Sequence, residues 1–518
     1  MRTGSDKEVV KRLRWKPLAI VATGAFFYWL YIWVGWETQR QDKILRTGLV
    51  LVIFGIVSFL WLLLVSGLPW KRRFKIAGLC LLGIAAFGGV FRISEVTGDL
   101  VPILEPRWRR MGQPTSAQST ASPVMPSAPL TNAFWFPQYL GPNRNGILSD
   151  VALNSDWNSN PPVQIWRHPV GPAWSGFAVA GSRAVTMEQR GEEELITCYD
   201  LKSGLLLWEH SYAARYGTTI GGEGPRVSPT LSKDHVYTMG GSGVTTCVNL
   251  SDGKPIWSRN LYAENKLSVA DWGVVSAPLL VGKQVIVSVG AGEGKSLFAL
   301  DALTGSTVWT GGDDRASYSS PTLLTLANRQ QILIFNNPGV AAHDPLDGRV
   351  LWSHPWKSSY PKITVPILVQ PNQILLSSGY GAGAELIEIA QTNGKFVPTT
   401  VWKSIRLKSK FGNLILWKGF IYGLDDGILT CINPKDGQSQ WKDGRYGHAQ
   451  MLLLDDLLLV TTESGELVLV DPNPTKLTEL ARLKVLNDKT WNPPAVVGPF
   501  VILRNHREAV CYKMPLRT

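Results

Sequence analysis

The chain has 518 residues and a formal net charge of +12, and 45% of its residues are hydrophobic. This length exceeds what one small core needs, so we expect several structural units. Residues 1–112 carry 17 Lys and Arg but only 7 Asp and Glu, whereas the remaining residues are nearly balanced. The basic excess therefore lies in the N-terminal segment, and we expect no nucleic-acid partner for the rest of the chain.

Three apolar runs near the N-terminus, residues 17–36, 47–67 and 76–93, have about the length needed to cross a lipid bilayer. Tryptophans lie at the ends of the first two runs, where interfacial anchors are expected. The third run is shorter and rich in Gly. We predict a membrane region of about three transmembrane helices within residues 1–110.

The basic residues predict how these helices are oriented. They are concentrated in the N-terminal tail and between the second and third runs, whereas the segment between the first two runs is more balanced. The positive-inside rule places both basic segments in the cytoplasm. Three crossings then put everything after about Arg92 outside, and two crossings would leave it in the cytoplasm. The first run is long, aromatic and without a small-x-small cleavage site, so we expect a retained helix.

Residues 111–133 are rich in Ser, Pro, Ala and Thr, which is typical of a linker. After them, a turn that ends in tryptophan recurs almost to the C-terminus, for example in Cys198–Trp208 and Cys247–Trp257. Each copy is a β-run, an Asp/Asn-x-x-(x)-Gly turn and a short strand. The tryptophans of these copies lie 39 to 52 residues apart: Trp166, Trp208, Trp257, Trp309, Trp352, Trp402 and Trp441. Four short strands per period are typical of a β-propeller blade.

The two ends of the repeat region complement each other. Ala509–Lys513 is a third strand with no fourth strand after it, and Val163–Trp166 is a fourth strand with no partners before it. Pairing them closes the ring and covers both exposed edges. We therefore predict an all-β fold over residues 134–518, an eight-bladed propeller with four-stranded blades. Seven blades remain an alternative because the sixth and seventh units are irregular.

These repeats resemble the quinoprotein-like (pyrroloquinoline-quinone-type) β-propeller family over roughly Phe134–Met514. The motif Phe136–Gly146 is similar to the one that precedes many membrane-anchored or secreted bacterial members. The resemblance implies a multi-pass protein of the bacterial cytoplasmic membrane with its propeller on the extracytoplasmic side. The family contains both quinone-dependent dehydrogenases and non-catalytic scaffolds, among them the lipoprotein that assists outer-membrane barrel assembly. It therefore implies a fold rather than an activity.

Most of the recurring residues have a structural interpretation. We expect the seven tryptophans to pack between blades and the turn Asp and Asn residues to cap their turns. Four cysteines occupy one position of the repeat that is Ala elsewhere, which indicates a small buried slot and free thiols (Cys198, Cys247, Cys431 and Cys511). The sequence has no CxxC and no metal-ligand spacing, although loop oxygens could bind calcium without leaving such a signature.

The loops that enter the innermost strand of each blade are the candidate site. If they converge, their cations and aromatic rings form a funnel suited to a planar anionic ligand or an acidic peptide. The candidates are Trp174, Glu223, Arg226, Asp271, Trp272, Arg315, Tyr318, Lys362, Lys410, Tyr446, His448, Trp491 and Asn492.

We weigh three functions. The first is a membrane-anchored scaffold without catalysis or cofactor that binds a protein or peptide at a propeller face. The second is a quinone-dependent dehydrogenase that passes electrons to the membrane quinone pool. The resemblance implies adjacent cysteines and calcium ligands for such an enzyme, but no Cys-Cys pair exists here; Asp271 would be its base, and Arg226, Lys362 or Lys410 would hold cofactor carboxylates. The third is a membrane-bound sensor with a ligand-binding propeller.

Overall fold

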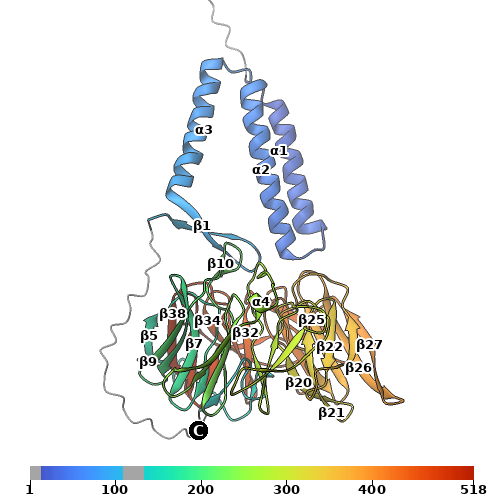
Figure 1. Ribbon diagram of the computed structural model, residues 1–518. Helices are drawn as coiled ribbons and strands as arrows, with labels where there is room; N and C mark the ends of the chain where they lie inside the picture. Colours follow the sequence, from blue (N-terminus) through green and yellow to red (C-terminus); the bar gives the residue numbers. More distant parts are fainter. Residues whose placement is uncertain (1–12, 109–133, 518) are drawn as a thin grey trace, which may run out of the picture. The chain divides into compact units, whose positions relative to one another are not determined.

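The computed structural model describes residues 13–108 and 134–517 and divides into two compact units, Met1–Met111 and Gly112–Thr518 (Figure 1). The first unit contains the long helices, and the second contains the β-sheets of a propeller. The predicted linker at residues 111–133 lies outside the described residues.

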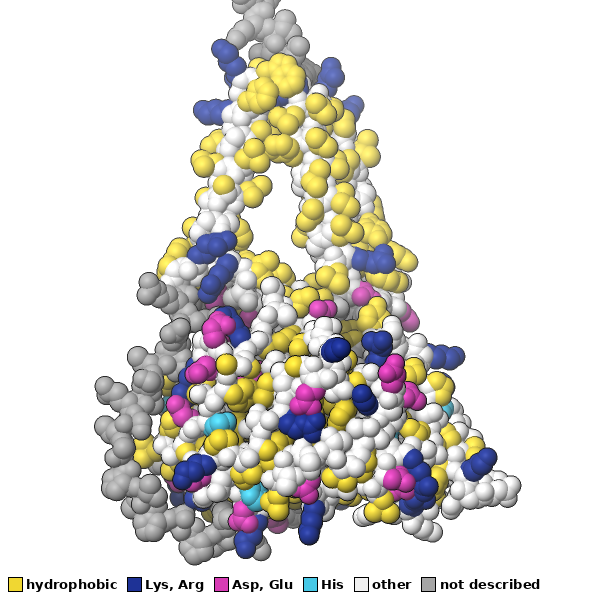
Figure 2. All heavy atoms as spheres, in the orientation of Figure 1, with side chains coloured by type: hydrophobic (Ala, Val, Ile, Leu, Met, Phe, Trp, Pro, Cys, Tyr) yellow, Lys and Arg dark blue, Asp and Glu magenta, His cyan; other side chains and the backbone are white. Residues whose placement is uncertain are grey.

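Three helices of the first unit are long and apolar enough to cross a membrane, judged by length and composition. They are α1 (Lys16–Leu30), which continues as the π-helix η1 (Tyr31–Gly35), α2 (Arg40–Leu64) and α3 (Trp70–Val90). Apolar side chains cover their surfaces, and Lys and Arg side chains gather near their ends (Figure 2). The predicted N-terminal region of three long apolar helices is confirmed.

The boundaries of the second and third helices differ from the predicted ones. The second begins at Arg40 rather than residue 47, and the third begins at Trp70 rather than residue 76, because Lys and Arg are good helix formers and extend both helices. Arg73 also donates to the carbonyls of Leu63 (2.5 Å) and Leu68 (2.6 Å), at the C-terminal end of α2. The third helix ends at Val90, because the chain continues as a hairpin of β1 (Phe91–Val96) and β2 (Pro102–Pro106).

Eight antiparallel sheets form the blades of the propeller. The first three are β6–β9 (Ala178–Ala180, Arg183–Arg190, Glu193–Asp200, Leu206–Ala213), β12–β15 (Thr230–Leu231, His235–Met239, Val244–Asn249, Pro255–Asn260) and β16–β19 (Leu279–Val281, Gln284–Ser288, Leu297–Asp301, Thr307–Gly311). The next three are β20–β23 (Thr322–Leu326, Arg329–Phe335, Gly339–His343, Val350–Pro355), β24–β27 (Ile367–Gln370, Gln373–Ser378, Gly383–Thr392, Lys395–Ser404) and β28–β31 (Ile415–Trp417, Phe420–Asp425, Ile428–Ile432, Ser439–Arg445).

The last two blades complete the ring. Blade 7 is β32–β35 (Gln450–Leu454, Leu457–Thr461, Glu466–Asp471, Thr478–Lys484), and blade 8 joins β36–β38 (Ala495–Val497, Phe500–Arg504, Glu508–Lys513) to β5 (Val163–Pro169). Cys511 lies opposite Trp166 in this closing pair. The predicted closure and the count of eight blades are confirmed.

Within the described part of the second unit, four short strands and one short helix lie outside the eight-blade repeat and were not predicted. β3 (Trp135–Phe136) pairs with the innermost strand of blade 1, and β4 (Ile147–Leu148) pairs in parallel with that of blade 7. β10 (Gly217–Thr218) and β11 (Gly222–Glu223) form a small hairpin between blades 1 and 2, and α4 (Leu261–Glu264) follows blade 2.

One register recurs in every blade. The third strand places a buried residue opposite the tryptophan position of the fourth strand, and a β-bulge follows it, as in Cys247 opposite Trp257. Leu386 and Leu469 fill this slot in blades 5 and 7, and Ala481 replaces the tryptophan of blade 7. All four propeller cysteines are buried and free, and burial raises the pKa of the Cys247 thiol to about 12, so it is unreactive.

The tryptophan of one blade contacts the turn of the next blade. Nε1 of Trp208 donates to the carbonyl of Leu250 (3.0 Å), and a Cβ on Gly253 would lie 2.4 Å from the indole ring. Glycine is therefore required at this turn by the close approach as well as by its φ of +73°. Equivalent tryptophan–glycine contacts are Trp166–Gly204, Trp257–Gly305, Trp309–Gly348 and Trp402–Gly437.

The apolar core lies between blades rather than in one centre. Separate clusters of buried side chains join blades 1 and 2, 2 and 3, 3 and 4, 4 and 5, 5 and 6, and 6 and 7, and the largest cluster joins blades 7, 8 and 1. Blade 5 lacks the Asp/Asn-to-Gly turn, and Trp352 of blade 4 donates instead to Gln331 of its own blade.

Replacing a turn glycine by alanine should lower stability more where the glycine lies against an indole ring than where the space is open. Gly253→Ala should destabilise the protein by about 2–4 kcal/mol more than Gly191→Ala. Both glycines have positive φ, but nothing lies within 4 Å of a Cβ at Gly191. The thermal unfolding midpoint of the full-length protein in detergent measures this difference. Equal shifts for the two variants would show that the turn does not depend on contact with Trp208.

Candidate functional site

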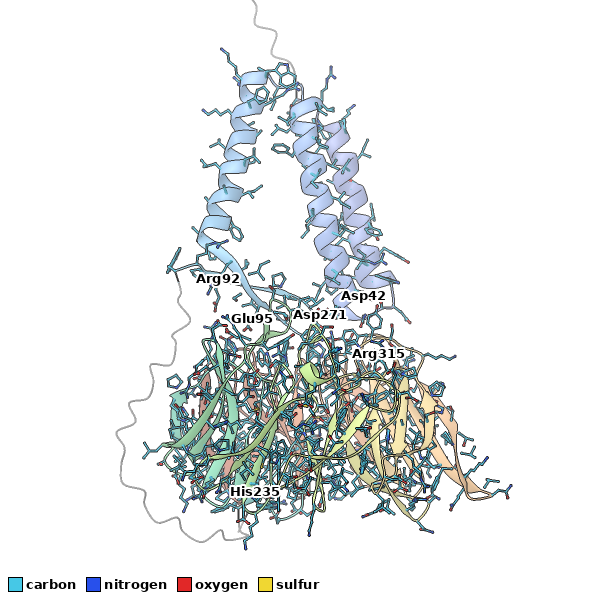
Figure 3. All side chains as sticks on the ribbon, in the orientation of Figure 1. Asp42, Arg92, Glu95, His235, Asp271 and Arg315 are labelled. Atoms are coloured by element: carbon cyan, nitrogen blue, oxygen red, sulfur yellow. The ribbon has the colours of Figure 1, made fainter. Side chains whose placement is uncertain are left out.

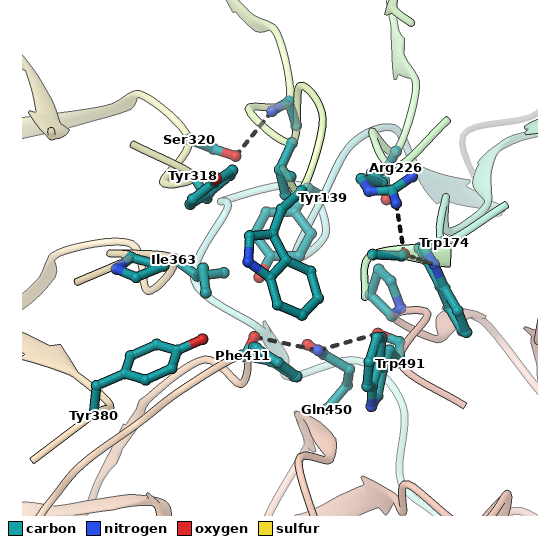
Figure 4. Close-up of a pocket in the computed structure, with 17 residues that line it drawn as sticks. Tyr139, Trp174, Arg226, Tyr318, Ser320, Ile363, Tyr380, Phe411, Gln450 and Trp491 are labelled. Carbon is teal, nitrogen blue, oxygen red and sulfur yellow. Dashed lines mark hydrogen bonds between the residues drawn. The ribbon is translucent and has the colours of Figure 1, made fainter. Parts of the chain in front are cut away.

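The loops that enter the innermost strands converge around a cavity of about 130 Å³ (Figure 4). We call this cavity the cup. Every blade contributes at least one lining residue, in chain order Trp174, Arg226, Trp272, Tyr318, Ile363, Phe411, Gln450 and Trp491. Because these loops occupy the same topological position in each blade, the cup lies at one end of the propeller channel.

Aromatic rings form a continuous wall on one side of the cup. The ring centroids of Trp174 and Trp491 are 4.8 Å apart, and those of Phe411 and Trp491 are 5.1 Å apart. Trp272 lies 6.2 Å from Phe411. Such separations are typical of favourable aromatic pairs. The wall is therefore a packed surface that presents ring faces and edges to a ligand.

The segment that precedes the repeats runs inside the propeller channel. We call residues 135–148 the channel segment. Its ends pair with blades 1 and 7 through β3 and β4, the carbonyl of Pro137 accepts from Leu231 of blade 2 (2.7 Å), and Gly146 packs against Asn413 of blade 6. Tyr139 of this segment lines the cup. The channel is therefore filled behind the cup rather than open along its length.

Arg144 fixes the channel segment to blade 3. Its guanidinium donates to the carbonyls of Ala277 (2.7 Å) and Pro278 (3.0 Å), and also to Gln138 (3.0 Å). Burial lowers the pKa of Arg144 to about 10, which leaves it charged at neutral pH. Charge-assisted hydrogen bonds of this kind are stronger than neutral ones.

Arg226 is the only charged side chain that lines the cup, among the described residues. It donates to the carbonyls of Gly221 (2.5 Å), Gly222 (3.0 Å) and Gly224, and its guanidinium lies 4.4 Å from the Tyr216 ring centroid. Burial lowers the pKa of Arg226 to about 10. The indole N–H of Trp174 also donates to Gly221 (2.8 Å), so both side chains hold the β10–β11 hairpin against the cup.

Two further cations lie against aromatic rings of the cup lining. Nζ of Lys489 is 4.0 Å from the ring centroid of Trp491 and 4.8 Å from that of Trp174. Nζ of Lys410 is 4.6 Å from the ring centroid of Tyr380. These distances are within the range of cation–π attraction.

Gln450 is a polar lining residue whose side chain joins two neighbouring loops. Its Nε2 donates to the carbonyls of Phe411 (3.3 Å) and Trp491 (3.2 Å), which belong to the loops of blades 6 and 8. Its Oε1 is buried and has no hydrogen-bond donor among the described residues. A buried acceptor without a donor is costly.

The predicted candidates divide into three groups. Those that line the cup are Trp174, Arg226, Trp272, Tyr318 and Trp491. Those that are buried next to lining residues are Lys362, Lys410, His448 and Asn492. Those placed elsewhere are Glu223, Asp271, Arg315 and Tyr446.

The candidates outside the cup have other contacts. Glu223 is paired with Arg215 (3.2 Å), and Tyr446 donates to Glu479 (3.0 Å). The side chains of Asp271 and Arg315, labelled in Figure 3, are exposed. Lys362 contacts Asn337 and the carbonyl of Tyr360, and burial lowers its pKa to about 8.

Several lining residues were not predicted from the sequence, notably Tyr139, Tyr380, Phe411 and Gln450. Phe411 directly follows a predicted candidate, and Tyr139 lies within the motif that precedes the repeats, so local signals existed for both. Gln450 has no such signal, because its partners come from two other blades.

The described ranges contain no group of three or more His, Cys, Asp or Glu side chains placed to hold a metal ion. The cup itself is lined, within those ranges, by no Asp, Glu, His, Cys or Lys side chain. The lining offers hydrogen-bonding groups, aromatic rings and one guanidinium.

Fold and site together define a closed eight-bladed propeller with a filled channel and an aromatic cup at one end. Residues 192–443 match the family model described as outer membrane protein assembly factor BamB. This match, over just under half of the chain, agrees with the sequence resemblance to the quinoprotein-like, pyrroloquinoline-quinone-type β-propeller family. No curated protein sequence matches the chain.

Solved structures with a similar fold include both branches of this family. Quinohemoprotein alcohol dehydrogenase from Comamonas testosteroni is 12% identical, covers 76% of this chain and 82% of its own, and gives a TM-score of 0.51. BamB from Moraxella catarrhalis is 14% identical, covers 68% of this chain and 100% of its own, and gives a TM-score of 0.48. At such identities the likeness concerns the fold alone.

The contacts of Arg144 predict how the channel segment is held. Arg144→Met removes the hydrogen bonds to blade 3, so amide hydrogen exchange within residues 138–147 should accelerate about tenfold or more. Arg517→Met serves as a matched control, because Arg517 is an exposed arginine paired with Asp455 and Asp456. Hydrogen-exchange mass spectrometry on the full-length protein makes the measurement. Unchanged exchange in Arg144→Met would mean that strand pairing alone fixes the segment.

Proposed function

We propose that the protein is a membrane-anchored propeller that binds another polypeptide at the cup and has no catalytic activity of its own. The observation that carries this proposal is the composition of the cup. All eight blades supply its lining, yet the lining contains, among the described residues, no carboxylate, imidazole, thiol or amine side chain that could act as a general base or as an activated nucleophile.

The lining has the character of a protein-binding pocket. Trp, Tyr and Arg dominate the energetically important positions of protein interfaces, because they combine a large apolar area with a polar group. The cup concentrates Trp174, Trp272 and Trp491 around Arg226. A side chain of a partner inserted there would be enclosed by rings while the surrounding loops contact the rest of the partner.

The quinone-dependent alternative has weaker support. Of the three cations considered for cofactor carboxylates, only Arg226 lines the cup, whereas Lys362 contacts Asn337 and Lys410 lies against the Tyr380 ring.

The location follows from the helices. Three helices able to cross a membrane, with the basic segments expected in the cytoplasm, support a propeller on the extracytoplasmic side of the bacterial cytoplasmic membrane. The partner is then a protein or peptide of that compartment.

A photoreactive phenylalanine in place of Phe411 tests this function in cells that express the full-length protein. Phe411 lines the cup, so irradiation should give a discrete adduct with one extracytoplasmic polypeptide, identified by mass spectrometry. The adduct should weaken severalfold when Trp272→Ala removes part of the wall.

Phe420 is the matched control position, since it lies after the β28–β29 turn at the opposite end of blade 6. It should give no such adduct. Absence of any adduct from position 411, together with quinone-dependent oxidation of alcohols by membranes containing the protein, would contradict the proposal.

A further inference from the structure

A short hairpin within the first unit begins where the third long helix ends. β1 starts at Phe91, directly after α3 ends at Val90, and β2 ends at Pro106. Arg107, the next residue, donates from its backbone N–H to the carbonyl of Val90 (2.8 Å) and from its side chain to that of Gly88 (2.7 Å). These hydrogen bonds hold the base of the β1–β2 hairpin against the last turn of α3.

The tip of the same hairpin is tied to a second long helix. Asp99, in the turn between the two strands, pairs with Arg40, the first residue of α2 (3.3 Å). The end of α3 and the start of α2 lie on the same side of any membrane that both helices cross; Arg92 and Asp42, labelled in Figure 3, are close to these two ends. Because the hairpin is attached at both places, it lies along that membrane surface.

The two broad faces of the hairpin differ in polarity. Successive cross-strand pairs of an antiparallel hairpin alternate between its faces. One face carries two apolar pairs, Phe91 with Pro106 and Ile93 with Leu104. The pair between them, Arg92 with Glu105, lies on the opposite face. Ile93 is 53% exposed and Leu104 is 48% exposed, whereas Glu105 is buried, so the exposed face of the hairpin is its apolar face.

A hairpin that lies along a membrane surface turns one broad face toward the lipid and the other toward water. Immersing the charged face would move the Arg92 guanidinium and the Glu105 carboxylate into a medium of low polarity, at a large cost in free energy. Immersing the apolar face would shield Ile93 and Leu104 from water, as in amphipathic segments that lie in the headgroup region. Trp108, which follows β2 and is exposed, is of a residue type enriched at this depth.

We propose that the β1–β2 hairpin is an interfacial anchor whose apolar face is immersed in the extracytoplasmic leaflet of the membrane. Ile93 and Leu104 lie at the boundary between headgroups and acyl chains, and the charged face is turned away from the lipid. This inference rests on the membrane-spanning helices of the proposed function. It adds a lipid-binding surface that those helices do not include.

A bimane fluorophore on Ile93→Cys, in a Cys80→Ala background, tests the inference in the full-length protein. Cys80 is the exposed cysteine and the other four are buried, so the fluorophore should attach at position 93 alone. The protein is reconstituted into vesicles of phosphatidylcholine and phosphatidylglycerol. Nitroxide lipids labelled on the acyl chain near the headgroup should quench the bimane strongly, and aqueous iodide should quench it weakly.

Leu303→Cys is the matched control, because Leu303 is an exposed apolar residue in a turn of blade 3. Both positions follow α3 in the chain, so they share one side of the bilayer. Bimane at position 303 should show the reverse pattern, with strong quenching by iodide and weak quenching by the nitroxide lipids. Iodide quenching at position 93 equal to that at position 303 would place the apolar face in water. Quenching at position 93 by neither reagent would show that protein covers this face. Either result would overturn the inference.

A double variant tests whether the apolar side chains themselves hold the hairpin on the lipid. With bimane on Trp108→Cys, Ile93→Ser combined with Leu104→Ser should increase iodide quenching severalfold. Leu303→Ser combined with Leu346→Ser, which removes two exposed apolar side chains from propeller turns, should leave that quenching unchanged. Unchanged quenching in the hairpin variant would overturn the role assigned to this face.

A third position separates failure of this inference from failure of the proposed function. Ile56 is an exposed residue within α2, so bimane on Ile56→Cys reports whether the helices are in the bilayer. Lipid quenching at position 56 but not at position 93 would leave the membrane anchor standing and sink the inference alone. No lipid quenching at either position would contradict the membrane anchor of the proposed function as well. Polypeptide binding at the cup is tested separately, by the adduct at position 411.

Discussion

The structure depends on the contact between the tryptophan of one blade and the glycine turn of the next. The indole covers the turn and donates to its backbone, as Trp208 does to Leu250, and the turn can approach only because Gly253 has no side chain. Burial of an indole contributes several kcal/mol, and the contact occurs at five of the eight junctions between described blades. Since each blade contacts mainly its neighbours, this repeated contact sets the angle between blades and brings the last blade back to the first. The loops at the other end of each blade are then held in a circle, which creates the cup.

The channel segment determines what kind of cavity this circle encloses. A propeller with an open channel could conduct water or small molecules, but residues 135–148 occupy the space between the inner strands. Arg144 anchors them to blade 3, and Tyr139 becomes part of the cup lining. The cavity that remains is lined by aromatic rings and one cation, Arg226.

Much of the fold could be predicted from the sequence, because its main contact is local and periodic. The tryptophan spacing predicts eight blades, and the unpaired strands at both ends predict the closure that β38 and β5 make. The long apolar helices were also predictable, although their boundaries were not, because charged residues such as Arg73 extend a helix that hydropathy alone would shorten. The cup was predictable only in part. Loop position identified Trp174 and Arg226. It did not show that Asp271 and Arg315 are exposed. The contacts of Gln450 could not be predicted, because they are made with carbonyls from two other blades.

On the proposed function, the cup accepts part of a polypeptide rather than a quinone cofactor. The most direct test is titration of the full-length protein with pyrroloquinoline quinone, with and without calcium, while tryptophan fluorescence is recorded. Trp174, Trp272 and Trp491 line the cup, so a quinone bound there would quench their emission. We predict no saturable quenching. Saturable, calcium-dependent quenching at micromolar concentrations or below would contradict the claim and indicate a quinone-dependent enzyme.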